Sequence, residues 1–87
     1  MSHHPTNFQG SITDAIAQAI KTKIADAEVQ VSGHGGHYSI IVTSEAFRGK
    51  GPVDSQRLVY GAITHLMTGD MAPVHAVDTL KTRVPSA

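Results

Sequence analysis

The strongest hydrophobic pattern in the chain lies between Ser11 and Ala25, where isoleucines recur at intervals of four residues. On a helix of 3.6 residues per turn they share one stripe with two alanines: Ile12, Ala15, Ile16, Ala19, Ile20 and Ile24. Ser11 is a residue type that caps helices, and Asp14 favours the positive end of the helix dipole. The pattern predicts a helix over about 11–25 whose apolar face packs into the core.

After Asp26 the hydrophobic period changes from that of a helix to two. Val29 and Val31 alternate with polar neighbours, which predicts a short, half-buried strand. Residues 32–37 (SGHGGH) hold three glycines and are expected to form a tight loop. Residues 38–43 (YSIIVT) are rich in β-branched residues, which predicts a central strand. The two strands are therefore expected to form an antiparallel hairpin.

The second half of the chain predicts two further helical segments and a last strand. Residues 44–47 (SEAF) fit a single helical turn that 48–51 (RGKG) end, and Pro52 suits the first position of a longer helix reaching about Met67. Gly69 and Pro73 mark a loop, and 74–82 (VHAVDTLKT) follow as the third strand. The predicted order is αββααβ.

This order predicts an α/β fold of the α+β type, a three-stranded mixed sheet packed by helices. Strands two and three are joined through a helix, so they are expected to be parallel neighbours linked by a right-handed crossover. His37 begins strand two and His75 begins strand three, which places both imidazoles at one edge of the sheet. Because neighbouring strands lie about 5 Å apart, two such side chains can converge on one metal centre.

Length and composition restrict the alternatives. A chain of 87 residues supports one core, so we expect one domain over 10–83 between a flexible lead-in at 1–9 and a tail at 84–87. The formal net charge is zero, so no chain-wide field attracts a nucleic acid, and cysteine is absent, so metal ligands must come from other residues or a partner. Without a run of about 20 apolar residues, we expect a cytoplasmic protein that has no contact with membranes. We expect it to be a monomer when it is alone.

Catalytic chemistry is not indicated by the residues. The sequence contains no nucleophile elbow, phosphate loop or HExxH motif. Asp78 and Glu45 fall on separate predicted elements, with no evident neighbour that would perturb their pKa values. A binding module is therefore predicted in preference to an enzyme.

Three segments carry a resemblance to a known family: SEAFRGK at 44–50, RLVY at 57–60, and VHAV at 74–77 with LKT at 80–82. In this order and at this spacing they resemble the BolA-like proteins, over about Ile12 to Thr82. The resemblance implies a fold similar to a class II KH domain, in agreement with the order of elements predicted from periodicity. The predicted domain at 10–83 is then a single BolA-like domain.

The resemblance also implies a function, because the family is associated with monothiol glutaredoxins and with a [2Fe–2S] cluster shared between the two proteins. It implies a heterodimer active in iron–sulfur cluster trafficking or in iron or redox sensing. His75 matches the family's ligand near the C-terminus, and the second ligand comes from the loop before strand two, here His34 or His37. We favour His37, because His34 lies among glycines and would lose more entropy on being fixed. The partner's cysteine and its bound glutathione would complete the set.

An alternative function is that of a KH-like DNA-binding transcriptional regulator. Five basic residues are candidates for a local patch: Arg48, Lys50, Arg57, Lys81 and Arg83. Two departures weaken this alternative: many family members carry RHR where 55–57 read SQR, and the turn GKG at 49–51 is not the GxxG of RNA-binding KH domains. Zero net charge also predicts weak, salt-sensitive binding.

Overall fold

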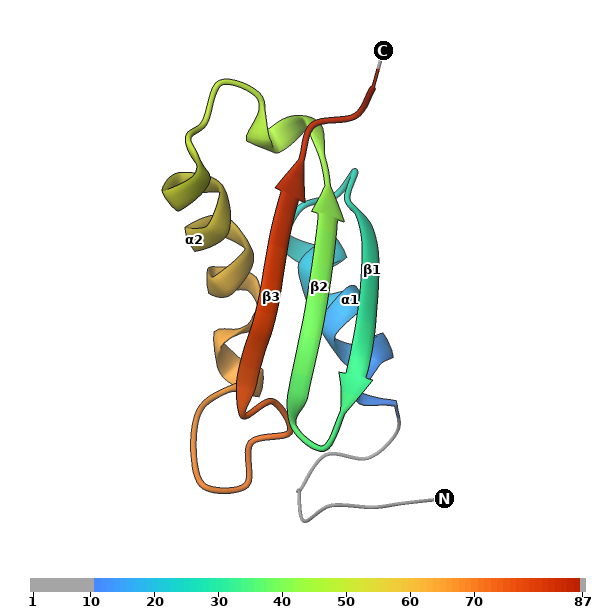
Figure 1. Cartoon of the computed structure of the whole chain (residues 1–87), viewed down its shortest axis with the longest axis vertical. Helices are drawn as coiled ribbons and strands as arrows, with labels where there is room; N and C mark the ends of the chain where they lie inside the picture. The colour runs from blue at the N-terminus through green and yellow to red at the C-terminus, as the bar shows by residue number, and fades with distance from the viewer. Residues whose placement is uncertain (1–10, 87) are drawn as a thin grey trace.

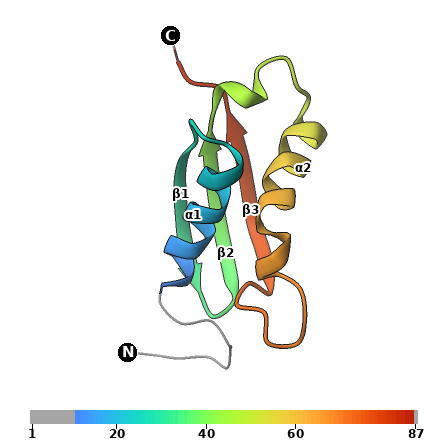
Figure 2. The same ribbon diagram turned by 180° about the vertical axis from the view of Figure 1, so that it is seen from behind.

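The structure is a computed structural model that describes residues 11–86, so the predicted lead-in at 1–9 lies outside the described residues. Its elements, in chain order, are α1 (Ile12–Lys23), β1 (Glu28–His34), β2 (His37–Thr43), the 3₁₀ turn η1 (Glu45–Phe47), α2 (Pro52–Ile63), the 3₁₀ turn η2 (Thr64–Leu66) and β3 (Ala76–Arg83). The three strands form one sheet in the order β1–β2–β3, and both helices lie against the same face of it (Figures 1 and 2). The predicted fold class is confirmed.

Strand directions also agree with the prediction. β1 and β2 pair antiparallel as a hairpin, whereas β2 and β3 pair parallel. A parallel pair requires a crossover, and here α2 and its flanking turns provide it (Figure 1). As a result β1 ends, and β2 and β3 begin, at the same end of the sheet.

The core lies between the helices and the central strand. Ile16 and Ile20 of α1 are fully buried, as are Ile40 and Val42 of β2 and Val59 of α2. Because side chains alternate along a strand, the residues between them on β2 face the opposite surface of the sheet, on which no helix of the described chain packs (Figure 1). We call this the open face of the sheet.

The helices end earlier than periodicity predicted. In α1, Ser11 caps the N-terminus by accepting a hydrogen bond from the backbone N–H of Asp14 at 3.3 Å, as expected. Ile24 leaves the helical conformation, yet it remains 4% exposed, so it belongs to the apolar stripe without belonging to the helix. The long helix likewise divides into α2 and η2, with Pro52 in its first turn as predicted. Neither helix between residues 11 and 86 combines the length and apolarity that a membrane span requires.

The third strand starts two residues later than predicted. Val74 is fully buried, and its N–H donates to the carbonyl of Leu66 at 3.1 Å, so it anchors the preceding loop instead of pairing with β2. His75 therefore lies just before β3, and Ala76 is the first strand residue, opposite His37.

The glycine-rich segment differs most from its prediction. β1 continues through Ser32 and Gly33 to His34, which pairs with His37, and only Gly35 and Gly36 form the turn. Their φ values of 66° and 88° fit a type I′ hairpin, which needs positive φ at both positions. The expectation that His34 lies in the loop is wrong, and with it the entropic reason for preferring His37.

Candidate metal-ligating end of the sheet

His75 is fixed to the hairpin turn through its backbone. Its N–H donates to the carbonyl of Gly36 at 2.8 Å, and the N–H of Ala76 donates to the same carbonyl at 2.9 Å. Two hydrogen bonds to one acceptor hold the start of β3 against the residue that precedes His37. The predicted placement of His37 and His75 at one edge of the sheet is therefore present in the backbone.

The imidazole of His75 packs directly over Gly36. An ideal Cβ built on Gly36 would lie 2.3 Å from His75 Cδ2 and 3.0 Å from Cγ, so the ring occupies the space that a side chain would need. Gly36 is itself buried. The ring is consequently held against the turn between His34 and His37.

His37 lies on the open face, where its ring contacts a carboxylate from the neighbouring strand. His37 Nδ1 is 3.2 Å from Asp78 Oδ1, and the side chains are 61% and 56% exposed. The register of the two strands shifts here, because Tyr38 pairs with Val77 while Ser39 pairs with Thr79. Asp78 is thus the extra residue of a β-bulge.

His34 is the third histidine at this end of the sheet. As the cross-strand partner of His37, it projects to the same face, and it is exposed. We call His34, His37 and His75 the histidine end of the sheet, the lower end in Figure 1. Between residues 11 and 86, no group of three or more histidine, cysteine, aspartate or glutamate side chains is close enough to hold a metal ion. Convergence of two rings on a metal stays a prediction.

Asp78 is the residue at this end that sequence reasoning missed. Asp78 and Thr79 are consecutive polar residues that interrupt the alternation of the third strand. Such an interruption is a sequence signal for a bulge. Its effect is to bring Asp78 beside His37, a contact that the separate positions in the sequence did not reveal.

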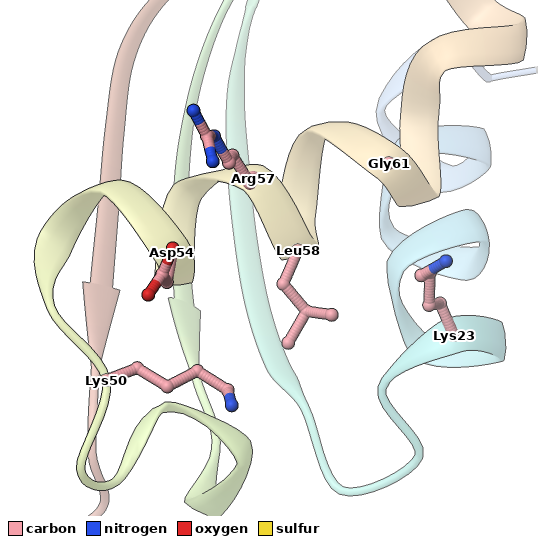
Figure 3. Close-up of a pocket in the computed structure, with 6 residues that line it drawn as sticks. All are labelled: Lys23, Lys50, Asp54, Arg57, Leu58 and Gly61. Carbon is pink, nitrogen blue, oxygen red and sulfur yellow. The ribbon is translucent and has the colours of Figure 1, made fainter.

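The basic residues of the alternative function lie on two surfaces. Lys50 and Arg57 line an open groove beside α2, of about 380 Å³, together with Lys23, Asp54, Leu58 and Gly61. In Figure 3, Lys50 and Lys23 approach this groove from opposite sides, with Leu58 between them. By contrast, Lys81 and Arg83 pair with Ile41 and Thr43, which alternate with the buried residues of β2, so they project to the open face.

Arg48, the fifth basic residue, is occupied by an ion pair. Its Nε and Nη2 donate to the two carboxylate oxygens of Glu45 at 2.7 and 2.9 Å. These hydrogen bonds lower the pKa of Glu45 and raise the pKa of Arg48. The expectation that Glu45 has no perturbing neighbour is therefore wrong, although the pair is exposed and local to one turn.

The first residues of the SEAFRGK segment have a structural role. The Ser44 hydroxyl donates to Asp26 Oδ1 at 2.5 Å and accepts from the N–H of Ala46 at 2.9 Å. The N–H of Glu45 donates to Asp26 Oδ2 at 2.9 Å. Together these bonds connect the α1–β1 loop to η1, at the end of the sheet opposite the histidines, and they lower the pKa of Asp26.

Comparison with known proteins assigns the chain to a family. The sequence model of the BolA-like proteins matches residues 12–86, from the start of α1 to beyond β3. This chain belongs to the BolA-like family. The BolA-like match includes the whole histidine end and the SEAFRGK segment.

Individual BolA-like relatives agree with this assignment. The acid stress protein IbaG of Escherichia coli K12 is 31% identical over 71 residues, covering 82% of this chain and 81% of IbaG. A protein of the rpoN–murA intergenic region of Acinetobacter guillouiae is 33% identical over 66 residues, covering 75% and 76%. The structure of a BolA homologue from Coxiella burnetii superposes with a TM-score of 0.72 at 32% identity, covering 87% of this chain and 94% of the homologue.

Proposed function

We propose that this BolA-like chain is a binding module that pairs with a monothiol glutaredoxin and ligates a shared [2Fe–2S] cluster through His37 and His75. The observation that supports the proposal is the attachment of His75 to Gly36, the residue before His37, by a backbone hydrogen bond and by packing of its ring. The family resemblance supports the same partner and cluster. Its cellular role would be cluster trafficking or the sensing of iron or redox state.

The donor set fits this cluster chemically. Two neutral imidazoles ligate one iron in Rieske-type centres, where they replace thiolates and raise the reduction potential. This chain has no cysteine, and within the described residues no third ligand joins the histidines. The partner would therefore supply the other ligands, from a glutaredoxin cysteine and bound glutathione. All three histidines are exposed, which leaves room for the partner's approach.

His37 remains the favoured second ligand, now for a reason based on the structure. The Asp78 carboxylate contacts its ring and restricts its rotation, whereas no hydrogen bond holds the ring of His34 in the described structure. A ligand whose orientation is set beforehand loses less entropy when it binds. His34 is the cross-strand partner of His37, so replacing each of the two in turn compares them directly as the second ligand.

Reconstitution with purified proteins tests the proposal. This chain, a monothiol glutaredoxin, glutathione, iron and sulfide are expected to yield a heterodimer whose absorption and circular dichroism spectra differ from those of the glutaredoxin homodimer. His75→Ala and His37→Ala should each restore the glutaredoxin-only spectrum. His65→Ala, which removes an exposed histidine of η2, is the matched control and should leave the heterodimer spectrum unchanged.

The variants also identify the ligands individually. An unchanged spectrum with His75→Ala removes that residue from the ligand set and overturns the proposal. Loss of the spectrum with His34→Ala but not with His37→Ala would transfer the second ligand to β1.

A further inference from the structure

We infer that Asp78 is a positioning residue for His37, holding the Nδ1–H of the imidazole so that Nε2 is the nitrogen left to bind a metal. This inference rests on the proposed function, which makes His37 a ligand. It concerns a contact between two side chains of this chain, and it can be tested without any cluster.

The hydrogen-bond chemistry determines which nitrogen carries the proton. An ionised carboxylate only accepts hydrogen bonds, and a neutral imidazole has one N–H donor and one acceptor nitrogen. With Nδ1 at 3.2 Å from Asp78 Oδ1, Nδ1 must be the donor, so the neutral ring carries its lone pair on Nε2. Metal-binding histidines commonly donate their second N–H to a carboxylate in this way, which fixes tautomer and ring orientation.

The β-bulge explains how Asp78 reaches His37. The extra residue falls between the Tyr38–Val77 and Ser39–Thr79 pairs, so Asp78 and Thr79 both lie on the open face. In a regular ladder, the residue after Val77 would stand level with Ser39, one step further from His37. Bulges are frequent beside functional sites, where they redirect a side chain.

The pair has little to contribute to the stability of the fold. Both side chains are more than half exposed, and exposed ion pairs add little to the free energy of unfolding because water and salt screen them. A purely structural role for the pair would therefore be small.

The first experiment measures the imidazole tautomer in the protein without metal. Long-range ¹H–¹⁵N correlation spectra, recorded at mildly alkaline pH, should show His37 as the Nδ1–H tautomer. Asp78→Ala should shift His37 toward the Nε2–H tautomer that free histidine prefers. Asp78→Asn keeps a carbonyl acceptor and should partly retain the Nδ1–H form, and Thr79→Ala, in the same bulge, should leave it unchanged.

The second experiment uses the reconstituted heterodimer. Loss of a carboxylate partner typically lowers metal affinity by about 10- to 100-fold, so Asp78→Ala should lose its cluster to a chelator correspondingly faster than the wild type or Thr79→Ala. An Nε2–H tautomer in the wild type, or one unaffected by Asp78→Ala, overturns the positioning inference alone. If the tautomer shifts as expected but the wild type forms no heterodimer cluster, the proposed function fails, and with it the role of Asp78 in positioning a metal ligand.

Discussion

Gly36 shows how one residue can determine the geometry of the histidine end. It adopts a φ of 88°, which disfavours any L side chain, and a Cβ there would collide with the ring of His75. Gly35, its neighbour in the same turn, also has positive φ, but a Cβ would meet nothing within 4 Å. The two glycines therefore separate the effect of backbone conformation from the effect of contact with His75.

Alanine substitution at these two positions gives a matched comparison. Gly35→Ala should lower the free energy of unfolding by about 1 kcal/mol, the cost of a side chain in the left-handed region. Gly36→Ala should lower it further, because the ring of His75 must move. In reconstitution with glutaredoxin, Gly36→Ala should weaken or abolish the heterodimer spectrum, while Gly35→Ala should keep it. Urea unfolding and absorption spectra measure both effects, and equal behaviour of the two variants would show that the ring position is not constrained by Gly36.

At the scale of the elements, the bulge in β3 inserts one additional residue, and the strand's side chains alternate regularly between core and open face before and after it. Val77 and Leu80 pack against the core on either side of Asp78 and Thr79. Removing Asp78 would restore a regular alternation, with Thr79 outside and Leu80 inside. Removing Lys81 would instead turn Thr82 outward and Arg83 toward the core, because side chains alternate with a period of two.

Single-residue deletions should therefore have opposite consequences in the same strand. The Asp78 deletion is expected to remain folded, with a circular dichroism spectrum and cooperative urea transition close to those of the wild type. The Lys81 deletion should lose several kcal/mol or fail to fold, because a buried unpaired arginine is strongly unfavourable. Comparable stability of the two deletions would contradict the assignment of Asp78 as the extra residue.

The link between Asp26 and η1 predicts a dependence of stability on pH. Hydrogen bonds from the Ser44 hydroxyl and the Glu45 N–H lower the pKa of Asp26 below its ordinary 3.8 in the folded protein. A lowered folded-state pKa stabilises the fold above the unfolded-state pKa, and this stabilisation is lost as pH falls through the folded value. The contribution of Asp26 should thus be complete at neutral pH, begin to decline near pH 4 and be lost as the pH falls through the lower folded-state pKa.

Asp26→Asn is the variant that isolates this effect. It should be less stable than the wild type at pH 7, and the difference should shrink as the pH falls from about 4 toward 2.5. Ser44→Ala, which removes the largest cause of the lowered pKa, should also reduce the dependence. Urea unfolding at a series of pH values gives the comparison, and parallel wild-type and Asp26→Asn curves over that range would contradict the link.

Local sequence predicted those elements whose own residues carry a clear signal, in spacing or in residue type. The isoleucines of α1 and the β-branched run of β2 are examples, and both are confirmed. The misread elements depend on contacts that are distant in sequence. His34 is a strand residue because β2 folds back on it, and Val74 leaves the strand because it bonds to Leu66. Local composition contains neither contact.

At the scale of the whole molecule, the topology determined how much of the candidate site the sequence could predict. Parallel pairing of β2 and β3 was enough to bring His37 and His75 to one end of the sheet. The ring packing on Gly36 and the approach of Asp78 depend on atomic positions that topology does not specify. The same topology separates the basic residues, because alternation places Lys81 and Arg83 on the face opposite the α2 groove.

This separation of charge predicts how the protein behaves toward duplex DNA. Net charge is zero, and the α2 groove presents three cations beside one carboxylate, so contact with about three phosphates is the most this surface supports. At about −0.9 per phosphate, the slope of log K against log salt should be near −3, with affinity falling roughly 40-fold between 50 and 200 mM salt.

Lys50→Ala combined with Arg57→Ala should reduce the magnitude of this slope by about 2, whereas Lys81→Ala on the other face should leave it unchanged. Fluorescence anisotropy across a salt series measures these slopes. Tight binding at 200 mM salt, or an effect of Lys81→Ala on the slope equal to that of the groove variants, would contradict this prediction. Either result would require both faces of the sheet to contact DNA as one surface, although the sheet itself separates them.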